Sequence, residues 1–121
     1  MFITGARSGT VTLWKAKKAT KSKKLFKGLP FLAYKNGRIF AARWNECVLE
    51  LDTNLNQMRK YTAKNKTSVT PVSIDANPDF LVVGWSDGSI VIHDRKENDK
   101  ARLFWDVVVS FTLITFILLN I

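Results

Sequence analysis

Hydrophobic and polar positions alternate with a period of two along several short stretches of the chain. The clearest stretch is Phe80–Asp94, where Phe80–Trp85 and Ser89–His93 flank Ser86-Asp87-Gly88. After the turn, Ile90 and Ile92 alternate with Ser89, Val91 and His93, which suits a strand with one better-buried face. Asp-Gly between two apolar runs favours a tight hairpin turn. The pattern therefore predicts a β-hairpin in this stretch.

The same hairpin pattern occurs two more times, at residues 2–15 and 39–52. When the three copies are aligned, Trp14, Leu51 and His93 hold one position, with separations of 37 and 42 residues. Gly5, Ala42 and Gly84 hold another. A period near 40 residues is typical of one four-stranded unit in a repeat protein. We therefore expect three hairpins that stack as successive units, with Trp14 and Trp85 mostly buried between sheets.

Other strands and turns are predicted between the hairpins. An inner strand is expected at Phe31–Tyr34, before an Asn36-Gly37 turn. Gln57–Thr62 is expected as an outer strand, and Val69–Asp75 as an inner strand that starts after Pro71. The expected turns are Arg7-Ser8-Gly9, Trp44-Asn45-Glu46 and Asn77-Pro78-Asp79.

The chain resembles the WD-repeat family of β-propellers in this repeated hairpin pattern and in the dipeptides that close the three copies, Trp14-Lys15, Leu51-Asp52 and His93-Asp94. The resemblance covers roughly residues 1–104. It implies an all-β partial propeller of about two and a half antiparallel blades. No copy has an intact Trp-Asp pair, so the buried network of histidine, aspartate and tryptophan that family repeats often build cannot form in the usual way.

The length of 121 residues is enough for one globular core but not for a closed ring. We therefore expect a fragment or a truncated product, with a partial propeller at residues 1–104 and an apolar tail at 105–121. In the tail, residues 107–119 contain no charge. Three explanations stay open: a membrane anchor using residues 103–121, an aberrant extension after the last repeat, or a strand of a further, incomplete blade.

The chain carries a net charge of +9 and a dense run of lysines. Seven lysines without any acidic residue fall in the thirteen residues from 15 to 27: Lys15, Lys17, Lys18, Lys21, Lys23, Lys24 and Lys27. We expect a solvated loop that leads into an outer strand near Leu25-Phe26. Such a loop protects a sheet edge, or it attracts phosphate or carboxylate groups without reading bases.

Nothing in the sequence indicates catalysis, a cofactor or a metal. Asp75 and Asp79 are interpreted as turn residues, not as an acid/base pair, and His93 lacks the neighbours of a metal ligand. Cys47, the one cysteine, opens a strand and is expected to be a buried structural thiol in a reducing compartment.

The second copy, residues 36–52, is also similar to the atypical repeats of echinoderm microtubule-associated-protein-like propellers. That resemblance implies binding to microtubules, whose tubulin tails are acidic. The expected function is a non-catalytic protein-interaction scaffold in the cytoplasm, with a cytoskeletal location if it binds microtubules. A membrane-tethered module and a scaffold for RNA or another polyanion remain alternatives.

Overall fold

The computed structural model describes residues 1–43, 47–61, 69–96 and, for the backbone alone, 101–104. Its elements in these ranges are all strands. They are β1 (Phe2–Gly5), β2 (Thr10–Lys15), β3 (Lys18–Lys24), β4 (Phe31–Lys35), β5 (Arg38–Ala42), β6 (Val48–Leu51), β7 (Gln57–Tyr61), β8 (Pro71–Ala76), β9 (Phe80–Trp85), β10 (Ile90–Asp94) and β11 (Ala101–Phe104). No helix in the described part is long and apolar enough to cross a membrane.

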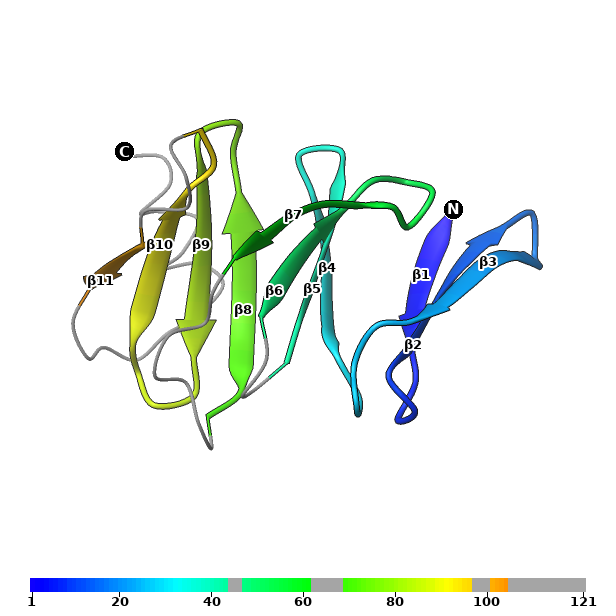
Figure 1. Cartoon of the computed structure of the whole chain (residues 1–121), viewed down its shortest axis with the longest axis horizontal. Coiled ribbons are helices and arrows are strands. Elements are labelled where there is room, and N and C mark those ends of the chain that lie inside the picture. The colour runs from blue at the N-terminus through cyan, green and yellow to red at the C-terminus, as the bar shows by residue number, and fades with distance from the viewer. Residues whose placement is uncertain (44–46, 62–68, 97–100, 105–121) are drawn as a thin grey trace.

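The strands form three antiparallel sheets that stand side by side in chain order (Figure 1). The first sheet is β1-β2-β3, the second is β4-β5-β6-β7, and the third is β8-β9-β10-β11. Every strand pairs with its neighbour in the sequence, so each sheet is a simple meander. The described sheets form an open row and not a closed ring. The all-β prediction and the placement of one hairpin in each sheet are confirmed.

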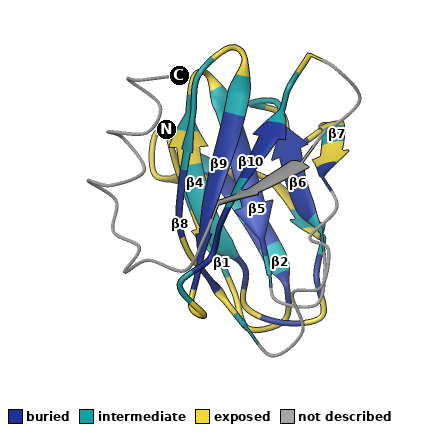
Figure 2. Ribbon diagram, turned by 90° about the vertical axis from the view of Figure 1, so that its left-hand side faces the viewer, coloured by how far each residue is buried: buried dark blue, intermediate teal, exposed yellow. Residues whose placement is uncertain are grey.

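Two apolar clusters fill the spaces between the sheets, and the buried residues concentrate on the strands of the second and third sheets (Figure 2). Between the first and second sheets lie Val11, Leu13, Phe26, Ile39, Ala41, Leu49, Leu51 and Leu55. Between the second and third lie Phe40, Ala42, Val48, Tyr61, Ile74, Leu81, Val83 and Trp85. Because successive residues of a strand point to opposite faces, the second sheet contributes to both clusters.

The predicted turns at Asn36-Gly37 and Gly9 are confirmed, and each relies on positive φ. Asn36 and Gly37 have φ of 51° and 71°, as a tight two-residue hairpin requires. Gly9 has φ of 87°, and a Cβ there would lie 1.7 Å from the Phe26 carbonyl oxygen. The Leu25 and Phe26 N–H groups donate to the Gly9 carbonyl and hold the Phe26 backbone close to Gly9. Only glycine therefore fits that position.

The lysine-rich segment is a strand and not the loop expected from its composition. β3 pairs with β2 along Lys18–Lys24, and Leu25 and Phe26 follow the strand instead of forming it. Phe26 is buried in the first cluster. The prediction was wrong because a strand that is exposed on both faces needs no apolar alternation.

Trp85 is fully buried as expected, but Trp14 is only half-buried. Val11 and Leu13 of β2 point toward the second sheet, so Trp14 points the other way. There its ring stacks on Phe2, with centroids 5.8 Å apart. The expected burial of Trp14 between sheets is therefore wrong, because no described sheet lies on that side.

Cys47 is also not the buried thiol that the sequence suggested. It lies just before β6, is half-buried and packs against the first apolar cluster. Two other expectations lie outside the described residues: the turn at 44–46 and the tail at 105–121.

Candidate interaction surface on the first sheet

The hairpin of β2 and β3 carries most of the lysines predicted as a binding site. Its two-residue turn, Ala16-Lys17, has φ of 50° and 63°. Left-handed backbone costs a non-glycine residue about 1–2 kcal/mol, and neither alanine nor lysine favours it. Lys15 and Lys18 lie directly opposite each other across this turn. Like charges in that position repel. Three ammonium groups thus gather at a turn whose own stability does not explain them.

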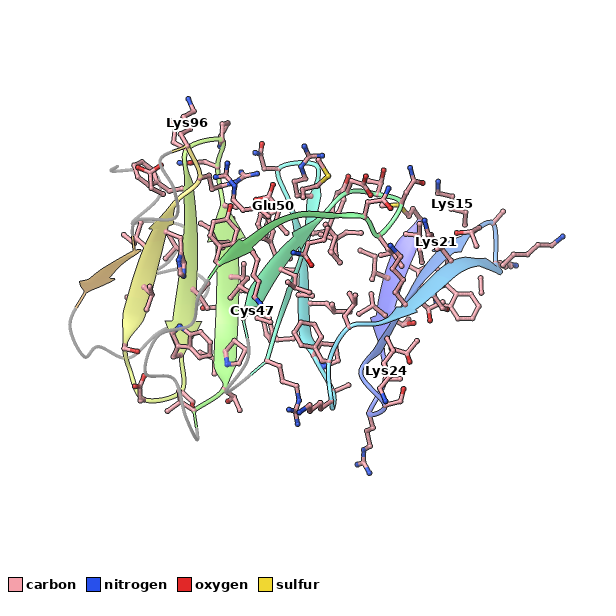
Figure 3. The ribbon with its side chains drawn as sticks, in the orientation of Figure 1. Lys15, Lys21, Lys24, Cys47, Glu50 and Lys96 are labelled. Carbon is pink, nitrogen blue, oxygen red and sulfur yellow. The ribbon has the colours of Figure 1, made fainter. Side chains whose placement is uncertain are left out.

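The structure divides the seven predicted lysines into two groups. Lys21 and Lys23 pair with Leu13 and Val11, so they point toward the second sheet. The Lys23 ammonium donates to the Leu55 carbonyl at 3.0 Å, and the charge of Lys21 helps lower the pKa of Asp52. Of the seven lysines, only Lys23 is partly buried. The other six are exposed: Lys15, Lys17, Lys18, Lys21, Lys24 and Lys27. Figure 3 shows Lys15 and Lys21 at the upper end of the first sheet and Lys24 near its lower end.

Asp52 itself serves the link between β6 and β7. Its carboxylate accepts the backbone N–H groups of Asn56 and Asn54, at 2.9 and 2.8 Å. The Asn56 backbone bond is the main reason that the pKa of Asp52 lies below its usual value, and Lys21 adds a smaller effect. Asp52 lies outside the lysine run, so the local sequence pattern does not relate it to Lys21.

A second charged cluster, which the sequence analysis missed, lies between the second and third sheets. Glu50 is buried and accepts hydrogen bonds from the Tyr61 hydroxyl (2.7 Å) and the Arg95 guanidinium (3.0 Å). The Arg38 guanidinium approaches the same carboxylate at 3.3 Å. Arg95 also donates to the Asn77 carbonyl and lies over the Phe40 ring. We call Glu50, Tyr61, Arg95 and Arg38 the Glu50 cluster.

The Glu50 cluster shifts the titration of its members. Burial alone would raise the pKa of Glu50, but the hydrogen bonds from Arg95 and Tyr61 and the charges of Arg95 and Arg38 lower it below its usual value. Burial, and then the bond to Glu50, raise the pKa of the Tyr61 phenol. The His93 ring packs against Tyr61, with centroids 5.2 Å apart. Glu50 and Arg95 are buried between the sheets, Arg38 is partly exposed, and the geometry of the cluster joins the two sheets.

The aspartates considered as an acid/base pair have separate structural roles. Asp75 accepts the N–H of Ala76, so it bonds nearby backbone as expected, but it lies inside β8 and is not a turn residue. Asp79 instead forms an exposed ion pair with Lys96 at 2.6 Å, and Asn77 is the residue whose side chain caps this turn, at Asp79 N–H and Phe80 N–H. Within the described ranges, no three histidine, cysteine or acidic residues group as metal ligands.

One signal in the sequence could have revealed the Glu50 cluster. Glu50 stands between Leu49 and Leu51 in a run that alternates toward two buried faces, where a carboxylate needs a cationic partner. Its partner, Arg95, lies 45 residues away in the next sheet, so local spacing could not identify it.

Comparison with protein-family models finds none that matches the chain, and comparison with curated proteins finds no match either.

Proposed function

We propose that this chain is a non-catalytic interaction scaffold, part of a WD-like β-propeller, that binds acidic protein segments through the β2–β3 hairpin. The row of antiparallel sheets, with one hairpin of the repeat in each, supports the propeller proposal. The observation that carries the function is the hairpin turn, where Lys15, Lys17 and Lys18 are exposed and the backbone has positive φ at two residues that do not favour it.

The preferred partner is an acidic peptide tail, such as those displayed by tubulin on microtubules. Exposed ammonium groups are strongly hydrated point charges that attract carboxylates and phosphates collectively. Charges separated by more than about 8 Å are screened at physiological salt, so a cluster at one turn acts more effectively than the same charges spread over the surface. The net charge of +9 adds long-range attraction.

The test uses a variant that changes the hairpin and leaves the contacts between sheets intact. Lys17→Glu with Lys18→Glu lowers the formal charge from +9 to +5, and neither side chain has a role in the apolar clusters. Lys23 is left unchanged because its bond to Leu55 joins two sheets. The matched control is Arg7→Glu with Lys60→Glu, which gives the same net charge from two exposed positions away from the turn.

We expect the hairpin variant to bind microtubules with at least tenfold lower affinity in co-sedimentation, and the control variant to lose much less affinity. Binding of the unmodified chain should fall steeply with added salt. Microtubules stripped of their acidic tails should bind poorly. Equal losses of affinity in both variants would show that the net charge alone explains the binding. If the hairpin variant still binds microtubules but loses binding to RNA or to anionic vesicles, the partner of the hairpin is RNA or an anionic membrane and not an acidic protein segment.

A further inference from the structure

Thr20 is the extra residue of a β-bulge in the lysine-rich strand β3. The pairing of β2 with β3 shifts register between Leu13 and Trp14, and it passes over Thr20. The extra residue of such a bulge is left unpaired, and the ladder is disrupted around it. The Thr20 hydroxyl donates to the Leu13 carbonyl at 3.2 Å. Thr20 is therefore held to β2 by its side chain and not by a cross-strand pair.

The second sheet shows that this position is exposed even where a sheet lies on each side. Its hairpin of β6 and β7 has the same bulge, with a register shift between Glu50 and Leu51 that passes over Met58. Met58 is 51% exposed, although the first and third sheets both pack against the second. Thr20 holds the equivalent position on β3 and is exposed as well. Its exposure is thus a property of the outermost strand of a sheet.

The strand that carries Thr20 is weakly held in its sheet. No residue of β3 belongs to either apolar cluster, and six of its seven residues are exposed. Beyond Thr20 the hairpin ends in the left-handed Ala16-Lys17 turn, where Lys15 lies opposite Lys18. Segments with few buried apolar contacts open locally at a low cost in free energy. An enzyme that binds its substrate as an extended, separated segment can therefore reach this part of the chain.

Lysines precede and follow the Thr20 hydroxyl along the chain. Lys17 and Lys18 lie three and two residues before Thr20, and Lys21 follows it directly. Protein kinases select their substrates by charge patterns of this kind. Basic residues before the acceptor fit a kinase whose peptide groove is acidic. The chemical surroundings of Thr20 are therefore those of a substrate for such an enzyme.

We propose that Thr20 is a phosphorylation site for a protein kinase that selects basic segments, and that its phosphate weakens binding by the β2–β3 hairpin. The Thr20 Oγ forms a bond to the γ-phosphorus of ATP, and the bond from that phosphorus to the bridging oxygen breaks to release ADP. The hydroxyl proton passes to the catalytic aspartate of the kinase. The effect on binding rests on the proposed function of the hairpin, whereas the site itself does not.

The phosphate changes the charge of the hairpin turn. Phosphothreonine carries a charge of about −1.5 to −2 and has three acceptor oxygens. The turn has three ammonium groups, those of Lys15, Lys17 and Lys18. Because Thr20 lies two residues from Lys18 on the same strand, its phosphate competes within the chain for the groups that an acidic segment would bind. The hairpin then attracts carboxylates less strongly.

Ser22 is a matched control on the same strand. It pairs with Thr12 in the regular part of the ladder, and the two hydroxyls share a hydrogen bond of 2.9 Å. The residues three and two positions before it are Ala19 and Thr20, which carry no charge. Ser22 therefore lies among the same lysines but lacks both the bulge and the preceding basic pair.

The first test incubates the full chain with MgATP and the catalytic subunit of cyclic-AMP-dependent protein kinase, and locates phosphate by fragment mass spectrometry. We expect phosphate on Thr20. Ser22→Ala should leave its incorporation unchanged, and Lys17→Glu with Lys18→Glu should slow it at least tenfold. Absence of phosphate from Thr20, or equal incorporation at Ser22, would overturn the assignment of the site.

The second test compares binding before and after the kinase treatment. Phosphorylation should lower the affinity for microtubules in co-sedimentation at least tenfold, and a phosphatase should restore it. Thr20→Ala, treated in the same way, should bind equally before and after treatment. Unchanged binding by the phosphorylated chain would overturn the regulatory effect. If the untreated chain does not bind microtubules, the proposed function and its regulation fail together, and the position of the phosphate still decides the site.

Discussion

Glu50 is a carboxylate placed between two sheets, and its partners come from both of them. Arg38 and Tyr61 belong to the second sheet, and Arg95 follows the last residue of β10 in the third. A buried carboxylate is tolerated only when it is paired and hydrogen-bonded, because its desolvation is costly. Glu50 therefore joins the second sheet to the third through one side chain.

Glu50→Gln is expected to destabilise the fold by about 3 kcal/mol, because it leaves the Arg95 guanidinium buried without a counter-charge. Asp79→Asn is the matched control: it makes the same chemical change in the exposed pair with Lys96 and should cost less than about 1 kcal/mol. Urea unfolding of both variants measures the difference. Similar losses in the two variants would contradict a special role for the Glu50 cluster.

The same carboxylate predicts a loss of stability in acid. The pKa of Glu50 is lower in the folded protein than its ordinary value of 4.5. Folding thus favours the ionised form, so its stabilising contribution is present above about pH 4.5 and is lost as the pH falls through the lower, folded value. Urea midpoints measured from pH 7 to pH 3 should fall for the unmodified chain more than for Glu50→Gln. Parallel curves would contradict the assignment.

At the scale of strands and turns, the two-residue turns of the first two sheets differ in how well their residues suit the backbone. Asn36-Gly37 and Ala16-Lys17 both have positive φ at both positions, but only the first has residues that favour it. The Ala16-Lys17 turn is therefore costly for its residues and crowded with like charges, and its own stability does not explain this choice of residues.

Exchanging the turn residues should change stability in opposite directions. Ala16→Asn with Lys17→Gly is expected to stabilise the chain by about 1–2 kcal/mol, because it removes left-handed strain and one ammonium group. The reciprocal change, Asn36→Ala with Gly37→Lys, should destabilise it by a similar amount. Urea unfolding at low and high salt separates the strain from the charge repulsion. No gain from the first exchange would show that the Ala16-Lys17 turn is not strained.

The sequence predicts elements that have one buried face and turns that carry Gly or Asn. The hairpins around Gly9, Asn36-Gly37 and Gly88 have such turns and at least one buried face on a strand, and they are confirmed. β3 meets neither, because it is exposed on both faces and its turn has ordinary residues. The lysine cluster was visible in the sequence, but the separation of Lys21 and Lys23 depends on how the second sheet packs against the first. Long-range partners such as Arg95 of Glu50 lay beyond any local pattern.

At the scale of the whole molecule, the second sheet presents one face to the first sheet and the other to the third. Leu51 faces the first sheet and His93 faces the second, and both are fully buried. Trp14 holds the equivalent position on the outer face of the first sheet, beside Thr4 and Thr12. These polar neighbours replace Ala41 and Leu49 of the second sheet, so the outer face is more polar than the inner ones.

This arrangement predicts unequal costs for two chemically identical substitutions. Trp85→Ala should destabilise the fold by about 3–5 kcal/mol, because the side chain fills the space between the second and third sheets and its loss leaves a cavity. Trp14→Ala should cost about 1 kcal/mol, since the ring has only the Phe2 stack and a 2.9 Å hydrogen bond to Thr4 to lose. Urea unfolding of the two variants measures both costs. Equal losses would contradict the open outer face, because Trp14 would then have to be enclosed as fully as Trp85.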